Sequence, residues 1–128
     1  MTPKFIKPEI HNKGWGKETW IINKPKYCLK ILEFKEGKSF SMHYHIMKEE
    51  TWYISKGKLQ LDYFDLSTAE RVIKFLIPGD IVDIAPNIPH KIKALTDAEI
   101  IEVSTTHFEE DSYRVEPGDS QNQKCINL

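Results

Sequence analysis

Short apolar runs recur through the middle of the chain and constrain its fold more than any other feature. They follow one another about every 8–12 residues, with Gly, Pro, Asn or Asp between them. Period-two runs bounded by turn residues are typical of β-strands, and no stretch shows the longer period of an amphipathic helix. The predicted strands cover residues 19–23, 27–34, 39–45, 50–55, 58–64, 71–77, 81–84, 90–94 and 99–104. The sequence therefore predicts an all-β domain, a sandwich or a barrel.

Length and charge narrow the class of protein further. The 128 residues suffice for one domain, and the net charge of −1 argues against nucleic-acid binding, which needs a basic face. No stretch approaches the roughly 20 apolar residues that span a bilayer. We expect an N-terminal arm over residues 1–18, a β-barrel over 19–106 and a polar tail over 107–128.

The two cysteines are far apart in the chain. Cys28 and Cys125 form neither a Cys-x-x-Cys pair nor a zinc-finger spacing, so we expect two reduced thiols. Residues 1–7 also lack the apolar core of a signal peptide. Together these features favour a cytoplasmic protein.

The histidines carry the strongest chemical signal. His43 and His45 are two residues apart, so on a strand they point to the same face. A turn then returns the chain to Glu50, and two imidazoles and a carboxylate can converge on one point. His90, which follows a Pro-rich turn, is a fourth candidate ligand. Zinc, iron, manganese and nickel ions accept this ligand set.

The spacing around these residues resembles the two signature motifs of the cupin superfamily. The first is Gly37, five residues, His43-x-His45, four residues, Glu50, six residues, Gly57; the second is Gly79, five residues, Ala85-Pro86-Asn87, two residues, His90. Ala85, Asn87 and Ala94 replace the family's usual Pro, Gly and Asn. Asn tolerates the positive φ that such a turn requires.

The resemblance implies a small antiparallel β-barrel of the jelly-roll type, also called a double-stranded β-helix. One divalent metal ion would be held inside it by His43, His45, Glu50 and His90. We prefer Glu50 to its neighbour Glu49 because it restores the six-residue interval to Gly57 and shares a strand face with Trp52 and Ile54.

Smaller details resemble one branch of these proteins. Residues 48–53 (KEETWY), 89–91 (PHK) and 100–104 (IIEVS) look like the corresponding segments of the type II phosphomannose isomerase cupin domain. Residues 104–119 are similar to the end of single-domain cupins found among polysaccharide and nucleotide-sugar genes. The resemblance thus implies a sugar phosphate or a nucleotide sugar as substrate.

Further candidates surround the predicted metal site. Glu102 on the last strand is the candidate catalytic proton shuttle; it could instead orient a metal-bound imidazole or be exposed. Trp52 is a candidate for stacking on a sugar ring, although core packing is the alternative. The candidate anion binders are Lys30, Lys48, Lys91 and Arg114. His11 and His107 are assigned to the surface.

Three functions follow from these residues. The first is a metal-dependent isomerase or epimerase in polysaccharide or sugar-nucleotide metabolism. The second is a dioxygenase with iron or manganese, and the third is a non-catalytic sugar-binding domain. We expect a small-molecule ligand and a homodimer in which the arm over residues 1–18 reaches the partner, with no nucleic-acid or membrane partner.

Overall fold

The computed structural model describes residues 1–121 as eleven strands and a short 3-10 helix. The strands are β1 (Glu9–Lys13), β2 (Gly16–Asn23), β3 (Cys28–Phe34), β4 (Met42–Tyr44), β5 (Glu50–Lys56), β6 (Leu59–Phe64), β7 (Arg71–Leu76), β8 (Ile81–Ile84), β9 (His90–Ala94), β10 (Ala98–Ser104) and β11 (Tyr113–Glu116). The helix η1 spans Glu109–Asp111. The predicted all-β class is confirmed.

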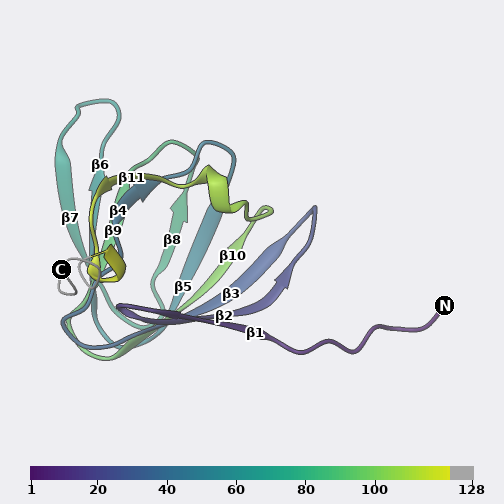
Figure 1. Cartoon of the computed structure of the whole chain (residues 1–128). Helices are drawn as coiled ribbons and strands as arrows, with labels where there is room; N and C mark the ends of the chain where they lie inside the picture. The colour runs from purple at the N-terminus through teal and green to yellow at the C-terminus, as the bar shows by residue number, and fades with distance from the viewer. Residues whose placement is uncertain (122–128) are drawn as a thin grey trace.

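The strands form two antiparallel sheets that enclose the interior (Figure 1). The first sheet has the strand order β1-β2-β3-β10-β5-β8, and the second has the order β11-β4-β9-β6-β7. β10 lies between β3 and β5, and β9 lies between β4 and β6, so each sheet interleaves strands from distant parts of the chain. This interleaving of two antiparallel sheets is the jelly-roll arrangement that the resemblance to the cupin superfamily implies.

Both sheets extend beyond the predicted barrel boundaries at residues 19 and 106. β1 pairs with β2 from Glu9↔Trp20 to Lys13↔Gly16, so half of the predicted arm belongs to the first sheet. β11, inside the predicted polar tail, pairs with β4. Both are edge strands with almost no buried residues, and therefore lack the apolar alternation that marks a strand in sequence. Residues 1–8 remain an extended segment that leaves the body (Figure 1).

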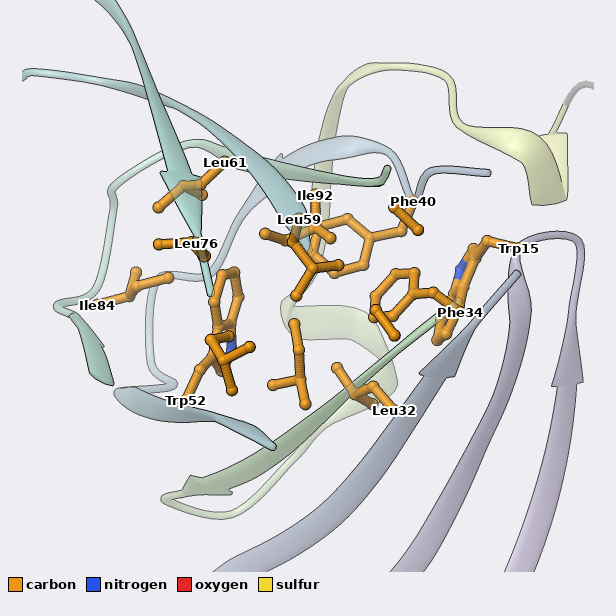
Figure 2. Close-up of a cluster of buried hydrophobic side chains, with 14 residues drawn as sticks. Trp15, Leu32, Phe34, Phe40, Trp52, Leu59, Leu61, Leu76, Ile84 and Ile92 are labelled. Carbon is orange, nitrogen blue, oxygen red and sulfur yellow. The ribbon is translucent and has the colours of Figure 1, made fainter. Parts of the chain in front are cut away.

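Inward-facing side chains of both sheets form one apolar core (Figure 2). Trp52, Ile54 and Ile100 have no exposed surface, and each such burial contributes about 1.5–3 kcal/mol. The Trp15 ring stacks on Phe34 with centroids 4.5 Å apart. The core members are Trp15, Leu32, Phe34, Phe40, Trp52, Ile54, Leu59, Leu61, Leu76, Ile84, Ile92, Ala94, Ala98 and Ile100.

Two positive-φ turns fix the geometry of the strands that carry the motif. Gly57 has φ +78°, and a Cβ there would lie 2.2 Å from the carbonyl oxygen of Asp97, so only glycine fits. Asn87 has φ 74° in the turn before β9, and its N–H donates to the carbonyl of His45 at 2.6 Å. As predicted, Asn replaces Gly at a position that needs a positive φ.

The structure also bears on the two predicted thiols and on the predicted absence of a membrane-spanning stretch. Cys28 is a buried free cysteine on β3, and burial raises the pKa of its thiol; Cys125 lies outside the described residues. Within residues 1–121, no helix has the length and apolar character needed to cross a bilayer.

Candidate metal centre

Three histidines meet at one end of the interior. His43 on β4 is the cross-strand partner of His90, the first residue of β9, and His45 lies just beyond the end of β4. One ring nitrogen from each histidine lies within 4.8 Å of the other two. The His43 ring centroid is 5.0 Å from that of His45 and 4.6 Å from that of His90. The strand pairing of the second sheet thus brings together residues that are 47 positions apart in the sequence.

Each of the three imidazoles is oriented by a backbone carbonyl. The Nδ1 atoms of His43, His45 and His90 lie 2.7, 2.8 and 2.9 Å from the carbonyl oxygens of Ser41, Asp111 and Ile88. A carbonyl can only accept, so each Nδ1 carries the proton and donates it. The three Nε2 atoms therefore keep free lone pairs, which is the tautomer that a metal-binding histidine needs.

Glu50 supplies the carboxylate next to these rings. Its Oε2 lies 3.4 Å from Nε2 of His45, and its Oε1 lies 3.8 Å from Nε2 of His90. The indole N–H of Trp52 donates to Oε1 at 2.7 Å and holds the carboxylate in place. Glu50 is buried and Glu49 is exposed, because alternate residues at the start of β5 face opposite sides.

Two buried atoms that make no hydrogen bond within residues 1–121 indicate that these residues fit a cation. Glu50 Oε2 and His90 Nε2 are buried and have no hydrogen-bond partner among the described residues. Leaving buried polar atoms unpaired is costly, on the order of 1–3 kcal/mol each. A divalent ion would satisfy both atoms at once, together with the Nε2 lone pairs of His43 and His45.

The electrostatic environment keeps His43 and Glu50 in the protonation state that a metal requires. Burial, with the neighbouring His90 and His45, holds the pKa of His43 well below its usual value, so the ring is neutral. Burial by itself raises the pKa of Glu50, but Lys48, His90 and His45 outweigh it and lower the pKa overall. Glu50 is therefore ionised.

A buried ion pair lies next to Glu50. Lys48 enters from the β4–β5 loop, and its Nζ donates to Glu102 Oε2 at 3.1 Å and lies 3.6 Å from Glu50 Oε2. Burial by itself lowers the pKa of Lys48, but the charges of Glu102 and Glu50 raise it above the usual value. Lys48 is therefore a permanent cation that links the candidate metal ligand Glu50 to the candidate base Glu102.

Lys30 lies beside this pair on β3, where Glu102 is its cross-strand neighbour. Its side chain is only 3% exposed. The ammonium group is 3.6 Å from Glu18 Oε1 and 4.2 Å from the centre of the Trp20 ring. A cation–π contact and a long ion pair thus stabilise a buried charge that still lines the cavity.

Two residues predicted to bind the substrate, Trp52 and Lys91, do not line the cavity, so both predictions need correction. Trp52 has no exposed surface, so no face is open for a sugar ring; it packs edge-on to His90 with centroids 5.4 Å apart. Lys91 follows His90 on β9 and therefore points to the outer face, 3.9 Å from Glu116.

The segment after β10, which the sequence analysis assigned to a tail, forms one wall of the cavity. The cavity has a volume of about 240 Å³ and includes the three histidines, Glu50, Lys48 and Glu102. Six lining residues come from this segment: His107, Glu109, Ser112, Arg114, Ser120 and Gln121.

Asp111, which was not among the predicted site residues, anchors this segment to the loop after His45. Its carboxylate accepts the backbone N–H groups of Ile46, Met47 and Lys48 at 2.9–3.2 Å, and its carbonyl accepts Nδ1–H of His45. These bonds connect residues more than 60 positions apart. In the sequence Asp111 is one of three consecutive acidic residues, and nothing in that run distinguishes it.

His107 also lies in the cavity wall, which corrects its assignment to the surface. Its side chain is 12% exposed, and its buried Nδ1 has no partner within the described residues. Burial, together with the charges of Lys30 and Lys48, lowers its pKa to about 4. His11 stays at the outer hairpin, where it stacks on Trp20 with centroids 4.1 Å apart.

Solved structures share this arrangement of strands. The capsular polysaccharide assembling protein CapF from Staphylococcus aureus superposes with a TM-score of 0.76 at 21% identity, over 88% of this chain and 32% of CapF. Oxalate decarboxylase from Bacillus subtilis superposes with a TM-score of 0.76 at 18% identity, over 84% of this chain and 30% of that protein. The chain has the cupin fold.

Each match covers only part of the solved protein, so it supports the fold and no further property. The cupin fold of this chain spans about a third of the length of CapF and of the decarboxylase. A further structure of the decarboxylase, concerned with its Mn(II) centres, superposes at 0.75 with 18% identity over 84% of this chain and 30% of that protein. No family model and no curated protein matches the chain.

Proposed function

We propose that the protein is a divalent-metal-dependent enzyme that isomerises or epimerises a small carbohydrate-like substrate, such as a sugar phosphate or a nucleotide sugar. One observation carries the proposal: three Nε2 lone pairs and the Glu50 carboxylate face a polar cavity that also contains the Glu102–Lys48 pair. A catalytic metal needs open positions beside its protein ligands, and the cavity supplies access to them.

His43, His45, Glu50 and His90 would hold the ion, and the polar atoms left unpaired at Glu50 and His90 support this assignment. When bound, the ion would supply a Lewis acid that polarises the neighbouring oxygens of a hydroxy-carbonyl group. The candidate ions are zinc, iron, manganese and nickel. Oxalate decarboxylase, one of the structural neighbours, has Mn(II) centres.

Glu102 is the proposed proton carrier. An isomerisation removes a proton from the carbon that bears the hydroxyl group and returns one to the neighbouring carbon, so no oxidant or reductant is consumed. The carboxylate of Glu102 would accept that proton and give it back. Lys48, which stays charged, would hold Glu102 in position and offset negative charge that develops on the substrate oxygens.

The proposal is tested by measuring the exchange of hydrogen for deuterium at a carbon atom of the substrate. The purified protein is analysed for metals and then incubated in D₂O with mannose 6-phosphate, other sugar phosphates and nucleotide sugars, and NMR records deuterium at the carbon beside the carbonyl. We expect exchange that requires the metal and is lost in Glu102→Gln. Oxygen consumption without exchange would indicate a dioxygenase, and binding without either reaction would indicate a sugar-binding domain.

We also propose that the protein forms a homodimer through its N-terminal segment. Phe5 and Ile6 are 95% and 61% exposed on an extended stretch that leaves the body (Figure 1). Apolar side chains on such a segment gain stability by packing against a second copy. Sedimentation velocity should give a dimer for the full chain and a monomer for Phe5→Ser/Ile6→Ser, and a wild-type monomer at high micromolar concentration would contradict this.

A further inference from the structure

The chain has two arginines, Arg71 and Arg114, and only Arg71 forms ion pairs within residues 1–121. Arg71 donates through Nε and Nη2 to Asp62 and through Nη1 to Glu116. Arg114 lines the cavity and makes no ion pair within residues 1–121. One guanidinium is thus neutralised by the protein, whereas the other is free at the mouth of the candidate metal site.

The position of Arg114 is set by its strand. Arg114 on β11 is the cross-strand partner of His43 on β4, and cross-strand partners project to the same side of a sheet. The preceding pair, Tyr113 and Tyr44, stacks on the other side with ring centroids 5.3 Å apart. Asp111 ties the start of the segment to the loop after His45. The backbone that carries Arg114 is therefore firmly held.

The charged side chains of the cavity wall are balanced in number, with four cations and four carboxylates, but they are unevenly paired. Glu50 and Glu102 share the single cation Lys48, Glu18 lies beside Lys30, and Glu109 lies 3.4 Å from His107, a ring that its low pKa keeps neutral near pH 7. Two further lining cations, Lys13 and Arg114, have no carboxylate within 4.0 Å among residues 1–121. A bound divalent ion would make the cavity positive overall, so the missing partner of the unpaired cation Arg114 is negative.

We infer that Arg114 binds an oxyanion group, a carboxylate or a phosphate, of the ligand that enters the cavity. The planar guanidinium fork matches both groups through paired hydrogen bonds. The further statement that this ligand is the substrate rests on the proposed function: the hydroxy-carbonyl end would reach the three histidines, and the acidic end would stay at the mouth beside Arg114. The substrate class is then an acidic sugar derivative, and neutral sugars are poor ligands.

The first experiment measures the anion site without metal or turnover. Inorganic phosphate and acetate are titrated separately into the metal-free full chain while NMR follows the Nε–Hε resonance of Arg114. We expect a saturable shift with at least one anion, which also tells phosphate from carboxylate, and no saturable anion-dependent shift of the Arg71 side chain. Absence of a saturable shift at Arg114 with both anions would overturn the inference.

The second experiment compares three ligands that share one hydroxy-carbonyl head. Dihydroxyacetone is neutral, dihydroxyacetone phosphate carries a phosphate, and hydroxypyruvate carries a carboxylate. Calorimetry on the metal-loaded protein should show at least one acidic ligand binding about tenfold or more tighter than dihydroxyacetone. Arg114→Ala should remove that preference, Arg114→Lys should keep part of it, and Lys93→Ala, which removes an outward-facing charge on β9, should keep all of it.

The outcomes separate this inference from the proposed function. An anion preference that Arg114→Ala leaves intact would overturn the role of Arg114, whatever the enzyme does. An anion preference that depends on Arg114 in a protein that neither binds metal nor catalyses exchange would support the inference while the proposed function fails.

Discussion

The two ends of the interior are built on the same strands but have opposite chemistry. Four inner strands each change from a charged or imidazole side chain to an apolar one within one inward-facing step of two residues. The pairs are Lys30 and Leu32 on β3, Glu50 and Trp52 on β5, His90 and Ile92 on β9, and Glu102 and Ile100 on β10. Strand alternation thus decides that a residue faces inward, and its chemistry decides whether it stabilises the fold or forms the site.

The apolar end of these strands therefore stabilises the fold, and the polar end forms the candidate site. The apolar end gains free energy from the burial of its side chains. The polar end buries Lys30, Lys48, Glu50, His90 and Glu102, and burying charges costs free energy that ion pairs only partly return. Substitutions at the two ends should therefore affect different measurements.

The largest expected effect on folding comes from the apolar end. Phe34→Ala removes a ring that is 3% exposed and stacked on Trp15, and should lower the free energy of unfolding by about 3–5 kcal/mol. Urea denaturation measures this, and the metal content of the folded fraction should equal that of the wild type. A loss of metal from fully folded Phe34→Ala would show that the two ends are coupled.

The matching change at the polar end should affect metal binding instead. His90→Ala removes one of four ligands, worth about 3–4 kcal/mol of a typical site, and should weaken metal affinity roughly a hundred- to a thousandfold. Competition with a chelator measures the affinity, and denaturation of the metal-free protein should show no comparable loss of stability. Undiminished metal content in His90→Ala would refute the assignment of the site.

A smaller effect is expected from the residue that holds the metal-binding loop. Asp111→Asn keeps the carbonyl that orients His45 but loses an acceptor for the backbone N–H groups of the loop. Metal affinity should fall about 10- to 100-fold, the range for groups that orient ligands. The visible spectrum of the cobalt-substituted protein should change as well. Glu110→Gln, at the neighbouring exposed position, is the control and should change neither.

The smallest predicted effect is a dependence of stability on pH at the cavity wall. The folded state keeps His107 neutral down to about pH 4, whereas the unfolded chain protonates it below about 6.5, so stability falls as the pH drops below 6.5. His107→Gln should remove about 1 kcal/mol of this loss at pH 5.5. Urea denaturation at pH 5.5 and 8 measures it; at pH 8 both states are neutral, and an equal pH effect in the variant would contradict the prediction.

The regular inner strands were predictable from local pattern. The bounds of β8 and β9 agree with the predicted residues 81–84 and 90–94, because Pro and Gly mark the adjoining turns. β4 is shorter than the predicted range 39–45, since Ser39 pairs with Lys93 only through an isolated bridge. β1 and β11 escaped prediction because edge strands bury too few side chains to show apolar alternation.

Some residues of the candidate site could likewise be predicted from the sequence, and others could not. The spacing of His43, His45 and Glu50 specifies a local arrangement, because i and i+2 on a strand share a face. Asp111 and His107 are joined to the site by contacts between segments more than 60 residues apart, such as Asp111 with Lys48 and His107 with Asn23. Such contacts leave no local periodicity that sequence analysis could detect.

The sequence by itself determined the all-β class, the inner strands, the positive-φ turn at Asn87 and the grouping of His43, His45 and Glu50, because each follows from neighbours a few residues apart. Only the tertiary structure decided that Trp52 is sealed in the core, that Lys91 points outward, and that the segment carrying Asp111 and Arg114 closes the cavity. The physical reason is that burial and charge pairing depend on which strands the jelly roll places side by side, and that pairing joins residues distant in sequence.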